Sequence, residues 1–155
     1  MKKCDHTSVG ILAWNEGKLL LIERAKFPFG YAVPAGHIDG HPSPLIAAKR
    51  ELKEEVGLEA MNLELILEAR MENHCGREDG TWHQWSLFSA DVSGEIQRSE
   101  DETKEAGWHS AEDITILAER TERFLAGAIP EAEWQENPGL EPVMYEFFKQ
   151  LKIIK

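Results

Sequence analysis

Three glutamates, Glu51, Glu54 and Glu55, stand within five consecutive positions of a segment that otherwise predicts a helix. On a helical wheel they fall within an arc of roughly 100°. None of them has a Lys or Arg four residues later, and the pair Glu51 and Glu55 costs about a few tenths of a kcal/mol. Clustered carboxylate oxygens are the ligands that Mg²⁺ or Mn²⁺ prefers, and a bound cation would remove the repulsion.

The alternative to a metal site is a solvated helix face, which a segment rich in Glu and Lys also predicts. The segregation of charge argues against this alternative. Lys49 and Lys53 stand on the far side of the wheel, and only Arg50 reaches the acidic arc, through Glu54 at the i,i+4 spacing.

The helix that carries these acids has clear boundaries in the sequence. Ser43 is a suitable N-cap, Pro44 suits the first helical position, and Gly57 suits a left-handed C-cap. The spacing therefore predicts a helix over 44–56. Its core stripe is expected to consist of Leu45, Ala48, Leu52 and Val56.

Strand and helix patterns interleave along the rest of the chain. A turn joins apolar segments 7–14 and 18–24 in a predicted hairpin, and "YAVPAG" is a short strand entering a loop. Segments 62–75 and 81–93 predict a second hairpin. An acidic loop follows at 99–107, and 111–155 is mainly helical around a polar connection at 131–139. These patterns predict an α/β (α+β) fold with a mixed β-sheet and helices on its faces.

The overall composition limits the class of partner. The chain of 155 residues suits one domain, and its net charge of -11 argues against bulk nucleic acid or an anionic membrane as a partner. A small phosphorylated substrate stays compatible, because a bound cation inverts the local charge. No signal peptide or membrane span is evident, and Cys4 and Cys75 lack paired spacing, so we expect a reduced, cytoplasmic protein.

The segment from Gly36 to Leu58 resembles the Nudix box, G-x5-E-x7-R-E-U-x-E-E-x-G-U, where U is a bulky aliphatic residue. Eight of the nine fixed positions agree, and they stand in the expected context of strand, loop and helix. The resemblance extends over nearly the whole chain and implies a single Nudix domain at 1–155, an α/β/α sandwich that includes a C-terminal helical segment at about 111–155. One position departs: Pro42 stands where the family has its first glutamate.

The resemblance implies a hydrolase that cleaves the pyrophosphate linkage of a nucleoside diphosphate derivative. Its metal ligands would be Glu51, Glu54, Glu55 and the Gly36 carbonyl, with Mg²⁺ as the cofactor and Mn²⁺ as the alternative. Arg50 would orient a glutamate. A general base is expected among the box glutamates or in the later acidic segment. The candidates there are Glu102 and, second, Glu105, and a plain solvated loop is the alternative.

Four residues are candidates for substrate binding. Arg24 ends a strand near the box loop and could pair with a phosphate, and His37 follows Gly36. Of Trp82 and Trp85, one could stack on a base, while the other packs in the core, because their spacing places them on opposite faces of a strand. Ordinary surface or core roles are the alternative for each residue. His74, His83 and His109 show no ligand spacing.

Other functions stay open at this stage. A catalytically silent module that binds a nucleotide is the alternative, favoured by Pro42 alone. Isomerisation of a prenyl diphosphate or removal of an RNA 5′ cap would use the same scaffold, although the acidic charge counts against long RNA. The resemblance also leaves a homodimer open, since many relatives pair.

Overall fold

In the computed structural model, which describes residues 1–155, the apolar segments near the N-terminus form the predicted hairpin. Strands β1 (Thr7–Asn15) and β2 (Lys18–Arg24) pair antiparallel. Both strands are buried over most of their length, which explains why they are apolar almost without alternation.

The sheet is mixed, as predicted. Strand β1 is central and pairs in parallel with β6 (His83–Ser93), which pairs antiparallel with β5 (Glu59–Met71) as the second hairpin. On the other side, β2 pairs with β3 (Tyr31–Ala32) and with β7 (Thr103–His109), while β4 (Ala35–Gly36) pairs with β1. The short β4 places Gly36, the first residue of the box, beside the central strand β1.

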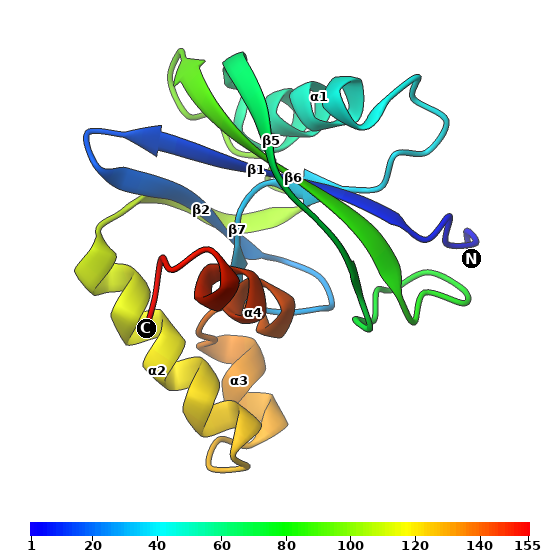
Figure 1. Ribbon diagram of the computed structural model, residues 1–155. Coiled ribbons are helices and arrows are strands. Elements are labelled where there is room, and N and C mark those ends of the chain that lie inside the picture. Colours follow the sequence, from blue (N-terminus) through cyan, green and yellow to red (C-terminus); the bar gives the residue numbers. More distant parts are fainter.

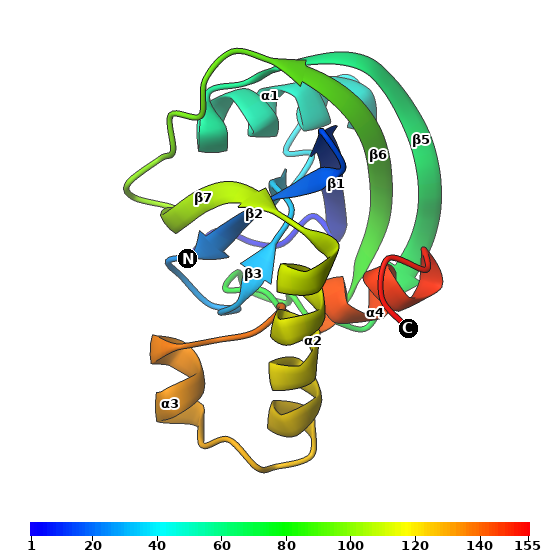
Figure 2. The same ribbon diagram turned by 90° about the vertical axis from the view of Figure 1, so that its left-hand side faces the viewer.

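Helices cover both faces of this sheet (Figure 1). Helix α1 (Pro44–Val56) lies on one face, whereas α2 (Ala111–Leu125) and α4 (Pro142–Gln150) lie on the opposite side. The short α3 (Glu131–Glu136) lies beside α2, away from the curved sheet (Figure 2). None of the four helices is both long and apolar enough to cross a membrane.

Two hydrophobic cores result, one on each side of the sheet. Successive residues of β1 alternate between them, so that Ile11 faces α1 while Leu12 faces α2 and α4. The first core lies against Ala48 and Leu52 of α1. The second core includes the predicted inner face of the C-terminal helix, namely Met144, Tyr145, Phe147, Phe148 and, partly buried, Leu151.

Three local predictions from the sequence were wrong. Half of the expected acidic loop is strand β7, because pairing with β2 supplies its backbone with hydrogen-bond partners. The expected polar connection at 131–139 contains α3, which is anchored by the buried Trp134 stacked on Phe124. Leu45, which was expected in the core stripe of α1, is exposed, and the buried face of the helix contains Ala47 instead.

We expect Phe147→Ala to lower the free energy of unfolding by about 3–5 kcal/mol, since it leaves a cavity in the second core. Ile116→Ala, on the exposed side of α2, should stay within about 0.5 kcal/mol of the wild type. Urea unfolding followed by circular dichroism measures both. Equal losses in the two variants would contradict the packing described.

Candidate functional site

The acidic arc of α1 overlaps the face that the helix buries. Ser43 caps the helix and Gly57 ends it in a left-handed conformation, as predicted. Glu55 is only 3% exposed, and its Oε2 accepts a hydrogen bond of 3.1 Å from the backbone N–H of Ala35. One carboxylate of the cluster is therefore inside the protein, against β4.

Glu51 lies against the other residue of β4. A Cβ atom at Gly36 would overlap the Glu51 carboxyl group, so the glycine is required for this close approach. Pairing of Gly36 with Val9 of the central strand fixes the backbone at this point. The carbonyl of residue 36 and the carboxylates of α1 thereby belong to one small region.

The electrostatics of this region are unfavourable without a cation. Burial, followed by the negative charges of Glu54 and Glu102, raises the pKa of Glu51 to about 8. Burial and the charge of Glu51 raise the pKa of Glu55 well above its ordinary value, while Arg24 acts in the opposite direction. Neither Glu51 nor Glu55 forms an ion pair. The neighbouring Arg50 pairs with Glu54 instead. Such a set of hard oxygen donors fits a divalent cation.

These acids face a cavity of about 220 Å³. Gly36, Glu51 and Glu55 line one part of it, and Glu102 reaches it from the segment before β7. Cationic groups also line it, including Lys26 and Arg77. The cavity thus combines acids that could hold a metal with cations that could contact phosphate oxygens.

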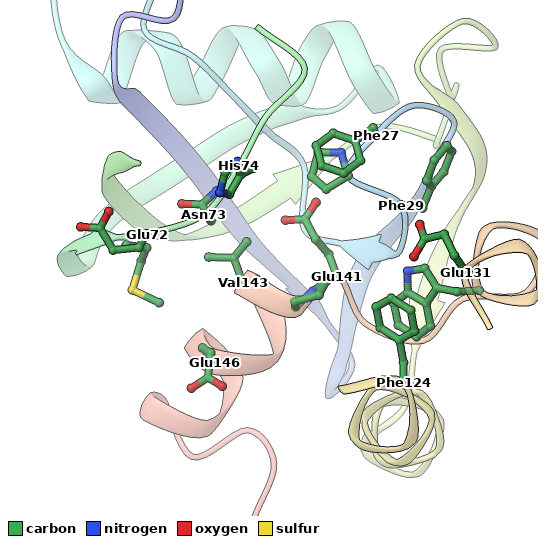
Figure 3. A pocket seen from close by; sticks show the side chains of 14 residues that line it. Phe27, Phe29, Glu72, Asn73, His74, Phe124, Glu131, Glu141, Val143 and Glu146 are labelled. Carbon is green, nitrogen blue, oxygen red and sulfur yellow. The ribbon is translucent and has the colours of Figure 1, made fainter. Parts of the chain in front are cut away.

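A larger, more apolar cavity of about 370 Å³ adjoins the acidic one and shares Pro28, Asn73, His74 and Glu141 with it. Figure 3 shows Phe27, Phe29 and Phe124 around one side of this second cavity, and Glu72, Asn73 and His74 across from them. Its size and aromatic lining suit an organic group attached to a phosphate.

A family model described as the NUDIX domain matches residues 5–131, which include the box, both hairpins and α2. The chain belongs to this family. The resemblance read from the sequence is therefore confirmed, as is the mixed α/β architecture.

Curated relatives of this Nudix chain are named as a hydrolase of capped RNA and as a nucleotide diphosphatase. The chain is 34% identical over 114 residues to the NAD-capped RNA hydrolase NudC of Pseudomonas aeruginosa, an alignment that covers 71% of the chain and 38% of the relative. It is 36% identical over 67 residues to the 8-oxo-dGTP diphosphatase of Haemophilus influenzae, which covers 41% of the chain and 49% of the relative. Each alignment spans less than half of the relative's own length.

Solved structures share the Nudix architecture at low identity. The E. coli ORF135 protein is 22% identical with a TM-score of 0.61, and the match covers 98% of this chain and 92% of that one. A MutT NUDIX hydrolase from Burkholderia pseudomallei is 23% identical with a TM-score of 0.60, over 69% of this chain and 84% of that one. At this identity the likeness concerns the fold.

The Nudix structure separates the remaining predicted catalytic residues. Glu54 is about half exposed and pairs with Arg50 at 3.0 Å, so both lie at the edge of the cluster. Glu105 does not line the acidic cavity, and its Oε2 instead accepts a hydrogen bond of 2.7 Å from the Tyr31 hydroxyl. Of the two candidates in the later acidic segment, the fold brings only Glu102 to the acids of α1.

Arg24 lines the acidic cavity, as its position before the box loop suggests. Its Nε donates to the carbonyl oxygen of Pro28 at 2.7 Å and lies 3.2 Å from Oε2 of Glu141. Glu141 is 3% exposed, and this oxygen has no hydrogen-bond partner. Figure 3 shows the Glu141 side chain between Val143 and Phe27.

Glu141 was missed in the sequence. Its position as the N-cap of α4 is the signal that could have indicated it. In the structure, its side chain makes no capping hydrogen bond. Glutamate is an unusual choice at that position compared with Ser, Thr, Asp or Asn.

The structure also separates the two tryptophans. Trp85 is buried, lines the acidic cavity and donates from Nε1 to Asn73 Oδ1 at 3.0 Å. Trp82 precedes β6 and does not line either cavity: it stacks on His6 at 4.2 Å and lies beneath Arg70. His37 lines the cavity, and burial together with Arg77 lowers its pKa to about 4.

The raised pKa values predict a pH-dependent stability of the metal-free protein. Glu51 holds its proton in the folded state up to about pH 8, whereas its ordinary pKa is 4.5. The folded state therefore binds more protons, and this group makes the free energy of unfolding fall as pH rises from 4.5 to 8. Glu51→Gln should remove part of that fall.

Urea unfolding in the presence of a chelator across this pH range measures the effect. Glu119→Gln, which alters an exposed residue of α2, is the matched control and should follow the wild type. If the free energy of unfolding depends on pH identically in the wild type and in Glu51→Gln, the conclusion that this carboxyl group is buried and protonated in the metal-free protein is wrong.

Proposed function

We propose that the protein is a Mg²⁺-dependent hydrolase that cleaves the pyrophosphate linkage of a nucleoside diphosphate derivative. The observation that carries this proposal is a pair of acids that β4 holds without an ion-pair partner, Glu51 against Gly36 and Glu55 against Ala35, in a cavity that Glu102 also lines. Membership of the Nudix family and the names of the curated relatives support the same class of reaction.

The metal would be held by Glu51, Glu55 and the Gly36 carbonyl, with Glu54 at the edge of the cluster. When bound, Mg²⁺ offsets the charge on the substrate phosphates and lowers the pKa of the attacking water, and Mn²⁺ could replace it. The buried carboxylates supply the negative charge that binds the cation. Arg50 holds Glu54 through its ion pair and so positions this ligand.

The other residues of the cavity act on water and substrate. Glu102 accepts the proton from the attacking water, because it is the acid of the later segment that reaches the cavity. Arg24, Lys26 and Arg77 lie where they can contact phosphate oxygens. Arg77 is also held by Asp39 through two hydrogen bonds, of 2.6 Å and 2.7 Å, which fix its guanidinium group.

The nucleoside or its attached group would occupy the apolar cavity. Phe124 and Glu141 contribute to its lining from the C-terminal helical segment, and the box side of the molecule contributes the acidic cavity next to it. Because both halves form parts of one substrate site, we propose that residues 1–155 function as a single unit.

The silent binding module stays the alternative, and Pro42 is its only support. Pro42 is exposed and does not line the acidic cavity, so the missing glutamate leaves the acids at Gly36 in place. This arrangement favours turnover over silent binding.

Incubation with NADH, NAD-capped RNA, 8-oxo-dGTP, ADP-ribose and dinucleoside polyphosphates tests the proposed reaction. We expect cleavage of at least one compound with Mg²⁺ and none after chelation, and Glu54→Gln should lower the rate by about 10–100-fold. Nucleotide binding by calorimetry without turnover at any Mg²⁺ or Mn²⁺ concentration would instead support the silent module.

Glu102→Gln should lower kcat by about 10²–10⁴-fold with little change in KM, since it removes the proton acceptor and leaves the cavity intact. Glu105→Gln is the matched comparison and should stay close to wild-type activity, because Glu105 contacts Tyr31 outside the cavity. Steady-state kinetics on the best substrate distinguishes them. A larger loss in Glu105→Gln would reverse the assignment of the base.

A further inference from the structure

Two cysteines and two histidines gather beside the acidic cavity, and three of them, His37, Cys75 and His83, line its wall. Each of Cys4, His37, Cys75 and His83 offers one ligand atom, and the four atoms all lie within 4.8 Å of one another. Cys4 and His83 are buried, and the other two are partly buried. None of these four residues is a glutamate of the Nudix box or the proposed general base.

The separations from Cys4 Sγ to the other three ligand atoms match those of a tetrahedral metal site, and all four atoms lie within 4.8 Å of one another. The Sγ atoms of Cys4 and Cys75 lie 3.9 Å apart, and Cys4 Sγ lies 3.6 Å from His37 Nε2 and 3.4 Å from His83 Nε2. Zinc bonds of about 2.3 Å to sulfur and about 2.0–2.1 Å to nitrogen, at tetrahedral angles, give separations of about 3.8 Å between sulfurs and about 3.5 Å between sulfur and nitrogen.

Strand pairing brings these distant residues together. The parallel register of β1 and β6 places Thr7 beside Gln84, so Cys4 precedes one strand near the point where His83 begins the other. Pairing of Val9 with Gly36 places His37 at the same end of the sheet. The backbone N–H of Cys4 donates to the carbonyl oxygen of Glu78 at 2.9 Å, which joins the N-terminal segment to the loop that carries Cys75.

Groups around the cluster orient the ligands. His83 Nδ1 lies 3.0 Å from the carbonyl oxygen of Asn73, which can only accept, so Nδ1 is the donor and Nε2 keeps its lone pair toward the sulfurs. Backbone N–H groups donate to both sulfurs, from His6 to Cys4 at 3.3 Å and from Arg77 to Cys75 at 3.4 Å. A Cβ atom at Gly80 would overlap the Cys75 sulfur, so the loop is shaped around this atom.

We propose that Cys4, His37, Cys75 and His83 bind one Zn²⁺ ion in a structural site separate from the magnesium site. Two thiolates and two imidazoles are the soft and intermediate donors that zinc prefers, whereas Mg²⁺ takes oxygen ligands. All four positions come from protein, so the site is closed and has no position for substrate. The ion ties the N-terminus and the loop at 72–82 to the residue after Gly36, and thereby fixes one wall of the acidic cavity.

A disulfide between Cys4 and Cys75 is the competing use of the two sulfurs. Both are free cysteines in this structure, and a disulfide would leave the convergence of the two histidine nitrogens without a role. The zinc site accounts for all four ligand atoms together.

Protein comprising residues 1–155, prepared anaerobically and dialysed against zinc-free buffer containing Mg²⁺, tests the site. We expect a zinc content of about one ion per chain, measured by elemental mass spectrometry. Cobalt substitution should give intense d–d bands of a tetrahedral ion with thiolate-to-metal charge transfer. Cys4→Ser, Cys75→Ser and His83→Gln should each lower zinc affinity by about tenfold or more and reduce the melting temperature.

His74→Gln is the matched control, because His74 neighbours Cys75 in sequence and is not one of the four ligands, so this variant should retain zinc. Wild-type protein that takes up neither zinc nor cobalt with both thiols free would overturn the proposal. So would a Cys4–Cys75 disulfide in the anaerobic preparation, or zinc that persists in all three ligand variants. These readouts need no substrate, so they succeed or fail independently of the proposed hydrolase activity.

Discussion

The burial of two carboxylates between α1 and β4 is the constraint on which the site depends. Glu55 accepts a backbone hydrogen bond from Ala35, and Glu51 occupies space that only a glycine at position 36 leaves open. Burial, together with the like charges held close by, raises the pKa of both acids. This arrangement is the basis on which we propose a cation-binding site beside the central strand of the sheet.

The rest of the molecule supplies complementary chemistry around that centre. The acidic cavity adjoins an apolar one, and Glu141 lies at their boundary, where its Oε2 pairs with Arg24 but accepts no hydrogen bond. The two proposed metal sites differ in donor type: oxygen ligands from α1 suit Mg²⁺, whereas sulfur and nitrogen ligands at the end of the sheet suit Zn²⁺. This difference would allow both ions to bind one cavity wall without exchanging places.

Sequence patterns predicted the elements whose signals are local. Both hairpins and the boundaries of α1 are confirmed, because turn residues, Ser43 and Gly57 act over a few positions. The charges of the acidic segment predict a loop and obscure a strand that only pairing with β2 stabilises. Likewise, the polar composition of 131–139 concealed a helix that a single buried residue, Trp134, holds against α2.

The sequence alone determined the family and the acids of the box, since their spacing on one helix is local information. Only the tertiary structure decided that Glu102 reaches the cavity while Glu105 does not, and that Glu141 lies between the two cavities. It also decided that two cysteines and two histidines converge, although Cys4 and Cys75 stand 71 positions apart. The register between β1, β4 and β6 sets these distances, and long-range strand pairing leaves no short motif in the sequence.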